Sequence, residues 1–106
     1  MKTDTELLEL AALAAGGEFH SGYFSLDGQG WRQWSPLDDD GDAFRLMVKL
    51  GLLVDCDSVL SEVEAVLVMH GHDDDYVRMR EPYEVDPNAA TRRAIVRAAA
   101  EIGAKL

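Results

Sequence analysis

Four aspartates and a glycine come directly before an apolar helical pattern in the stretch SPLDDDGDAFRLMVKLG, residues 35–51. Carboxylates gathered in this way could hold a calcium ion, take part in catalysis, or stabilise the start of a helix. An EF-hand loop with Gly41 at its glycine position would place Pro36 at the first ligand position and Met47 at the last. Neither residue offers a side-chain oxygen, so the sequence predicts helix capping. A weaker cation site on Asp38, Asp40 and Asp42 and an acidic patch that faces a partner stay as alternatives.

A second group of metal-ligand types occurs in HGHDDD, residues 70–75. His70 and His72 are two residues apart, so on a strand they could face the same way and share a metal with a carboxylate. A tight turn between strands selects Gly and Asp for backbone reasons alone. We expect a solvated turn here and keep a metal site as the alternative.

Other catalytic arrangements are weakly represented. His20 with Ser21 or Ser35 lacks a nucleophile elbow and an oxyanion-hole glycine run, and no phosphate-binding glycine motif occurs. Cys56 is the single cysteine, which excludes an intramolecular disulfide, and the aspartates on both sides of it disfavour a thiolate nucleophile. We therefore expect no catalytic residue, no bound metal and no cofactor.

Charge narrows the class of partner. The 106 residues contain 20 acidic and 10 basic side chains, which gives a formal net charge of −10. Direct binding to nucleic acid is disfavoured, because it needs clustered Lys and Arg, whereas a basic protein surface would be attracted. No stretch approaches the ~20 apolar residues that span a bilayer, and no signal-peptide pattern is present. We expect a single domain, residues 1–106, in the cytoplasm.

Helices are expected at the two ends of the chain. Thr3 and Glu6 have capping-box spacing, and Gly16 and Gly17 should end the first helix. In the last helix Asp86 is the expected N-cap and Pro87 the first helical residue, and the helix should end at Gly103. Its buried stripe is expected to contain Ala94, Ile95, Ala98 and Ile102. Its other side is expected to carry Arg92, Arg93 and Arg97, as a solvated face that pairs with nearby acids.

A central helix is expected after Ser35 as N-cap and Pro36 at its first position, with Gly51 as its terminator. Acidic residues at its start and Lys49 near its end both suit the helix dipole. Phe44, Met47 and Val48 are expected to form its apolar stripe, with Leu46 and Leu50 alongside.

Strands are expected in the remaining stretches. Residues 18–26 and 31–34 should form a hairpin around DGQG, and a short strand is expected at residues 52–54. Residues 60–69 are apolar on both faces toward their end, which indicates a central strand covered on both sides, and residues 76–80 should return beside it. Trp31 and Trp34 are either core anchors or a contact surface, and the large area of a buried indole favours the core.

The stretch WSPLDDDGDAFRLMVKLGL, together with ELLELAALAAG near the start and RRAIVRAAAEIG near the end, resembles the phage ABA-sandwich domain, a family of small bacteriophage and prophage proteins. The central match is carried by Trp34, Ser35, Pro36, Leu37, Asp39, Asp40, Gly41, Asp42, Ala43, Arg45, Leu46, Lys49 and Leu50. The resemblance implies an α+β fold, a three-layer α/β/α sandwich with a mainly antiparallel sheet and an N-terminal, a central and a C-terminal helix. It carries no agreed activity, so it transfers no active-site residues.

The phage setting and the acidic charge together favour a non-enzymatic protein that binds a host protein or nucleoprotein complex with a basic surface. A counter-defence inhibitor of the anti-CRISPR kind would be one example. Its expected partner-binding residues are Asp38, Asp39, Asp40, Asp42, Asp73, Asp74, Asp75, Trp31 and Trp34. The alternative is a phage structural or regulatory accessory protein that self-associates into a homo-oligomer. A metal-dependent hydrolase, which would depend on HGHDDD alone, comes third.

Overall fold

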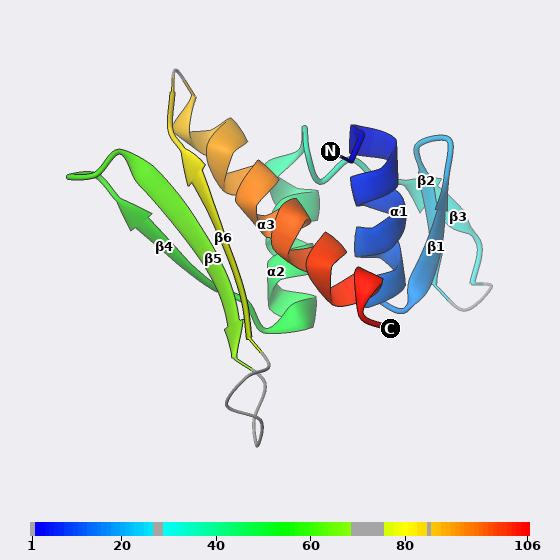
Figure 1. Ribbon diagram of the computed structural model, residues 1–106. Helices are drawn as coiled ribbons and strands as arrows, with labels where there is room; N and C mark the ends of the chain where they lie inside the picture. Colours follow the sequence, from blue (N-terminus) through cyan, green and yellow to red (C-terminus); the bar gives the residue numbers. More distant parts are fainter. Residues whose placement is uncertain (1, 27–28, 69–75, 85) are drawn as a thin grey trace.

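The strands form two separate antiparallel sheets, and the helices lie between them (Figure 1). The computed structural model describes residues 2–26, 29–68, 76–84 and 86–106. The first sheet has the order β1 (Gly17–His20), β2 (Tyr23–Leu26), β3 (Trp31–Gln33), and the second has the order β4 (Leu53–Asp57), β5 (Glu62–Val68), β6 (Tyr76–Pro82). The helices are α1 (Asp4–Ala14), α2 (Asp40–Leu50) and α3 (Pro87–Ala104).

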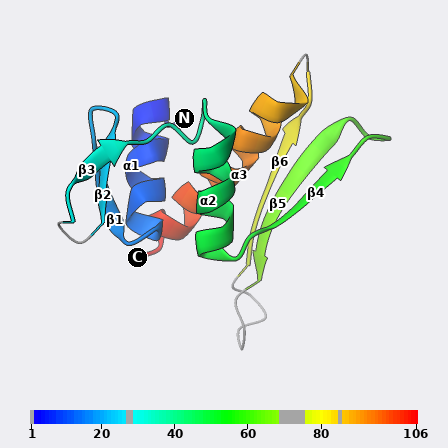
Figure 2. The same cartoon turned by 180° about the vertical axis from the view of Figure 1, so that it is seen from behind.

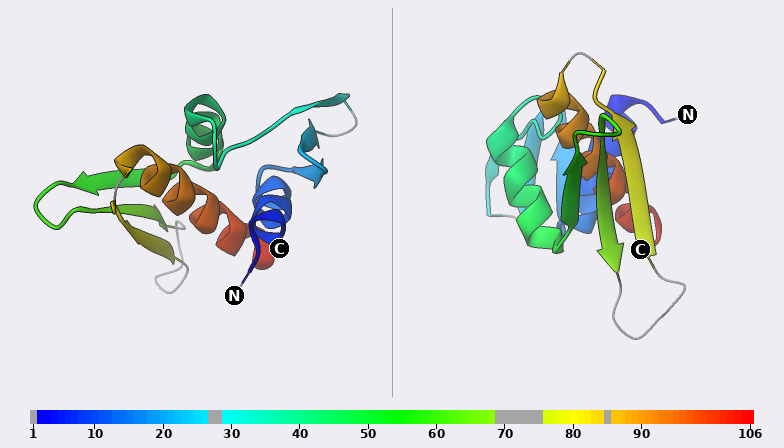
Figure 3. Two further views of the ribbon diagram at one scale, coloured as in Figure 1. Left: turned by 90° about the horizontal axis from the view of Figure 1, so that it is seen from above. Right: turned by 90° about the vertical axis from the view of Figure 1, so that its left-hand side faces the viewer.

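The expected α+β class is confirmed, as are its antiparallel strands and its N-terminal, central and C-terminal helices. The three layers follow the order sheet, helices, sheet, whereas the resemblance implied one sheet between two helical layers (Figure 3). The burial pattern of the strands gives the reason. In β1 buried and exposed residues alternate, and in β5 Val63 and Ala65 are buried while Glu64 between them is not. A sheet with one apolar face needs only one covering layer.

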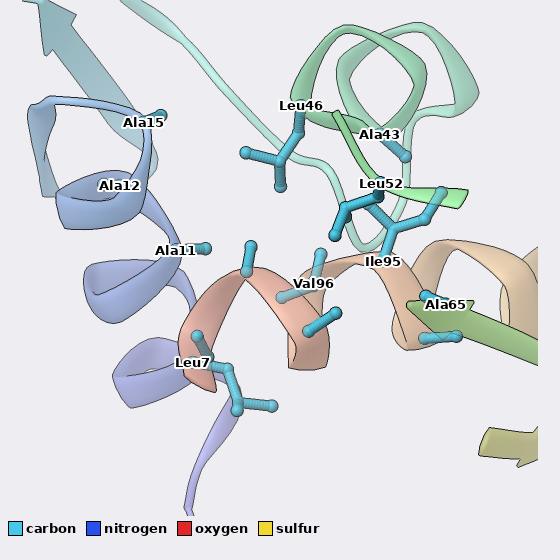
Figure 4. Packing of buried hydrophobic residues seen from close by; sticks show 14 of the residues in the cluster. Leu7, Ala11, Ala12, Ala15, Ala43, Leu46, Leu52, Ala65, Ile95 and Val96 are labelled. Atoms are coloured by element: carbon cyan, nitrogen blue, oxygen red, sulfur yellow. The ribbon is translucent and has the colours of Figure 1, made fainter. Parts of the chain in front are cut away.

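Helix α3 occupies the centre of the molecule. It packs against α1 on one side, against β5 and β6 on the other, and α2 lies across it (Figure 2). Ala94, Ile95 and Ala98 are buried as expected, and Leu7 and Ala11 of α1 point toward the same helix (Figure 4). The expected end of α3 at Gly103 is wrong, since the helix continues to Ala104.

The local signals at the starts of the two terminal helices are confirmed. The Thr3 hydroxyl accepts a hydrogen bond from the Glu6 amide, and the Asp86 carboxylate accepts from the amides of Asn88 and Ala89. Caps of this kind contribute about 1 kcal/mol each. Gly51 ends α2 in the left-handed conformation, with φ 70°, which glycine adopts without strain.

The expected start and buried face of α2 need correction. Ser35 does not cap the helix, because its carbonyl accepts from the amides of Asp38 and Asp39 in a separate turn, and the N-cap is Asp39. The buried positions are Asp42, Ala43 and Leu46, with Met47 and Leu50 half-buried, and they face the core. Phe44 and Val48, expected in the buried stripe, are each 60% exposed. Periodicity alone could not tell which of two adjacent apolar faces would meet α3.

The first sheet contains one more strand than expected. Ser21 and Gly22 both have positive φ, 50° and 88°, and form a two-residue turn between β1 and β2. This geometry matches the right-handed twist of a hairpin. The segment expected as one strand, residues 18–26, is therefore a hairpin, and β3 adds to its far side.

In the second sheet β5 is the central strand, as expected, and β4 and β6 pair with its two edges. Val63 and Ala65 face α3. The expectation that β5 is covered on both sides is wrong, because the opposite face of the sheet lies on the outside of the molecule (Figure 3). That face carries charged side chains from all three strands, whereas Glu81 of β6 lies on the inner face beside α3.

Candidate interaction surface

The acidic stretch before α2 acts mainly as a helix start. The Asp39 carboxylate accepts a hydrogen bond from the Asp42 amide at 2.8 Å. Asp42 is 8% exposed, and its carboxylate accepts from the Ser35 amide at 2.9 Å and from the Arg45 guanidinium at 2.6 Å. The predicted capping role is confirmed. Two aspartates carry this capping role, Asp39 at the N-cap and Asp42 three residues later.

Asp40 connects this helix start to the centre of the fold. Its carboxylate lies 2.6 Å from the Arg92 guanidinium, and the Arg92 Nε donates to the Leu37 carbonyl at 2.8 Å. The Arg92 side chain is 16% exposed, whereas the Asp40 side chain is 70% exposed, so the pair lies at the surface and anchors the helix start through the buried part of Arg92. Asp38 is exposed and makes no ion pair within the described part of the chain. Of the four aspartates, only Asp38 is thus uncommitted to the fold.

The arginines of α3 behave as predicted, since each pairs with a carboxylate. Besides the Arg92–Asp40 pair, Arg93 contacts Asp4 at 3.3 Å, and Arg97 binds Glu81. They tie α3 to α1, to α2 and to β6, and leave little free positive charge on that helix. A phosphate-binding role for the cluster gains no support from these contacts.

The metal expectations have two outcomes. In residues 2–26, 29–68, 76–84 and 86–106, no three His, Cys, Asp or Glu side chains are grouped as a metal site requires. The second candidate lies outside the described residues, which exclude His70, His72, Asp73, Asp74 and Asp75.

None of the helices in the described part of the chain has the length and apolar character that a bilayer-spanning segment needs.

The two tryptophans have different environments. Trp34 is 4% exposed and packs against Phe24, with ring centroids 4.9 Å apart, and against Phe19 at 5.8 Å. The core role is confirmed for Trp34. Trp31 is 51% exposed, and its nearest ring is His20 at 5.3 Å. Of the two, only Trp31 is available to a partner.

The outer face of the second sheet gathers acidic side chains from β4 and β5, a surface that was not expected from the sequence. We call it the acidic sheet face, and it consists of Asp55, Asp57, Glu62, Glu64, Arg78 and Arg80. Register brings these residues together, because Asp55 lies opposite Glu64, and Glu64 lies opposite Arg80. Glu64 binds Arg80 at 2.6 Å and Arg78 at 3.3 Å, which leaves Asp55, Asp57 and Glu62 without an ion pair in the described chain. The signal in the sequence was the two-residue spacing of Asp55 with Asp57 and of Glu62 with Glu64.

A small polar cluster lies on the inner side of the same sheet. The Cys56 thiol is exposed and its sulfur is 4.0 Å from the Thr91 hydroxyl. Burial of the nearby Tyr83 ring against the core raises the pKa of its phenol, and Cys56, Asp57 and Asp55 raise it further. A neutral phenol and a thiol in this position offer no base to activate a nucleophile.

Comparison with known proteins adds no constraint to this geometry. The chain matches no protein-family model, no curated protein and no solved structure.

Proposed function

We propose that this protein acts by binding the basic surface of another protein or nucleoprotein complex, without catalysis, through the acidic sheet face. One observation supports this most directly. Asp55, Asp57 and Glu62 occupy an open face of a rigid sheet and have no cation partner among the described residues. Three of the four aspartates before α2 are used by the fold, so that stretch contributes mainly Asp38.

Charge of this kind acts on the rate and the specificity of association. Opposite charge on the partner speeds the encounter, and the attraction decays over about 8 Å at physiological ionic strength. Salt should therefore weaken binding. The resemblance to phage proteins favours a host defence complex as the partner, in the manner of a counter-defence inhibitor. Nucleases and CRISPR complexes carry the basic grooves that such a surface would fit.

The test is affinity capture from bacterial lysate with the tagged protein and two double variants. Asp55→Lys with Glu62→Lys reverses charge on the acidic sheet face. Glu9→Lys with Glu18→Lys makes the same change in charge on exposed positions of α1 and β1, and serves as the matched control. We expect a set of captured proteins that is lost with the sheet variant and with added salt, and kept with the control. Capture that is equal for all three proteins and insensitive to salt would refute the proposal.

A second candidate is a phage structural or regulatory accessory protein that self-associates. It is favoured by apolar side chains at the β4–β5 turn, where Val59 is 90% exposed and Leu60 is 65% exposed. Exposed apolar side chains at a turn lower the solubility of a protein unless another protein surface covers them. Light scattering after size exclusion separates the two candidates, since a stable homo-oligomer favours the second.

A further inference from the structure

A groove between the first sheet and α2 combines an apolar floor with a positively charged rim. Its volume is about 190 Å³, and its floor is formed by Phe24, Trp34 and Leu46. Arg32, Arg45 and Lys49 line it as well, from β3 and from the exposed side of α2. This volume is below the range of about 300–1,000 Å³ that encloses a drug-sized ligand. The groove suits one or two apolar side chains that come with negative charge beside them.

Two of the three cations on this rim, Arg32 and Lys49, have no acidic partner in the described part of the chain. Arg32 lies over the Phe24 ring, 5.7 Å from its centroid, and no carboxylate pairs with it or with Lys49 in the described part of the chain. Every other arginine of the chain pairs with an acid. Arg45, the third cation of the rim, forms ion pairs with Asp39 and Asp42, and its side chain is 58% exposed. In a chain of net charge −10, two unpaired cations thus converge on one apolar groove.

The complementary feature is present on the same chain. The β4–β5 turn carries Val59 and Leu60, and Asp57 and Glu62 flank them in sequence. The Asp57 carboxylate accepts hydrogen bonds from the Val59 and Leu60 amides at 2.9 and 3.1 Å, which holds the turn in one shape. Holding a projecting segment in its bound shape lowers the entropy cost of docking.

We propose that the β4–β5 turn of one copy docks into the Arg32–Lys49 groove of a second copy. Val59 and Leu60 would cover the aromatic floor, and Asp55, Asp57 and Glu62 would face the cations of the rim. The turn and the first sheet lie at opposite ends of the molecule, so one copy cannot fill its own groove (Figures 1 and 3). The contact is heterologous, and it produces head-to-tail chains instead of a closed two-fold dimer. This inference rests on the second candidate function, self-association.

Sedimentation equilibrium from micromolar to millimolar concentration tests the proposal. The weight-average mass should rise without stopping at a dimer. Arg32→Gln with Lys49→Gln damages only the groove, and Val59→Ser with Leu60→Ser damages only the turn. Each variant alone should remain monomeric, with Kd raised about tenfold or more, because each lacks one half of the contact. Lys105→Gln, which removes a positive charge elsewhere, should associate like the unaltered chain.

Mixing the two variants gives the sharpest result. The groove variant keeps its turn and the turn variant keeps its groove, so the mixture should form a one-to-one dimer and nothing larger. Circular dichroism of each variant shows that it is folded. A monomer at millimolar concentration would refute both self-association and this contact. Self-association that survives in either variant, or that stops at a dimer of the unaltered chain, would refute the contact while leaving self-association intact.

Discussion

Gly103 of α3 lies so close to Leu10 of α1 that a Cβ at residue 103 would overlap the Leu10 carbonyl oxygen. The interface between these helices is made largely of small side chains. Ala11 of α1 and Ala99 of α3 are completely buried in the core. Small residues bring two helix backbones together at full packing density, and little space remains for an added group.

Replacing Gly103 with alanine should therefore destabilise the fold, although alanine favours helix more than glycine does. The backbone carbonyl of Leu10 cannot move aside like the end of a flexible side chain, so α1 and α3 must separate. We expect a loss of about 2–3 kcal/mol in the free energy of unfolding, measured by urea denaturation. Glu101→Ala, on the same helix, is the control and should change little. A Gly103→Ala protein as stable as the unaltered chain would contradict the close approach.

The two tryptophans should differ in their contribution to stability. Trp34→Ala removes an indole packed between Phe19 and Phe24, and should cost about 3–5 kcal/mol. Trp31→Ala, at an exposed site on β3, should cost less than about 0.5 kcal/mol. Fluorescence gives an independent check. The Trp31→Phe protein should emit at shorter wavelength than the Trp34→Phe protein, because its remaining indole is away from water. Equal emission maxima would contradict the assigned burial.

Asp42 is the aspartate of the acidic stretch on which the fold should depend most. Asp42→Asn keeps the shape of the side chain but replaces one acceptor oxygen with an NH₂ group, which would face the Ser35 amide or Arg45. A donor placed against a donor in a buried site should cost about 1–3 kcal/mol of stability. Asp38→Asn makes the same chemical change at an exposed position and should be neutral. Equal stability of the two variants would show that Asp42 is not the structural carboxylate.

Features encoded within a few residues could be predicted from the sequence. Thr3, Asp86 with Pro87, and Gly51 mark helix ends in the structure as expected, because a cap depends only on its own turn. Ser35 misled the prediction because Asp39, one turn later, competes for the same role. The Ser21–Gly22 turn carried a signal of its own, since Gly after Ser favours a turn.

Features that depend on distant partners could not be predicted in this way. The burial of Ala43 and Leu46 in place of Phe44 depends on where α3 lies, and the role of Gly103 depends on Leu10. The acidic sheet face was missed for the same reason, since Asp55 and Arg80 share a face only because β4 and β6 each pair with β5 at Glu64. The helix-start role of the acidic stretch was predicted, while the ion pair of Asp40 with Arg92 was not.

Alkaline pH should weaken the fold through Tyr83. Burial raises the pKa of this phenol above its usual value of 10.0, with Cys56, Asp57 and Asp55 adding to the shift. The folded state therefore prefers the neutral phenol. The resulting contribution to stability is complete below the pKa of the unfolded chain and is lost as pH rises through the folded pKa. We expect the free energy of unfolding to fall with pH above about 10, the pKa of an unperturbed tyrosine.

Two variants assign this pH dependence to Tyr83. Tyr83→Phe should flatten the alkaline decline in stability, because phenylalanine carries no proton to lose, whereas Tyr23→Phe, at an exposed strand position, should leave the decline unchanged. Asp55→Asn removes one of the negative charges that disfavour the phenolate, so it should lower the pKa of Tyr83 toward the usual value. The phenolate absorbance, titrated as the difference between each protein and its Tyr83→Phe counterpart, measures that pKa directly. A Tyr83 pKa at or below the usual value would mean that its ring is solvated and does not pack against the core.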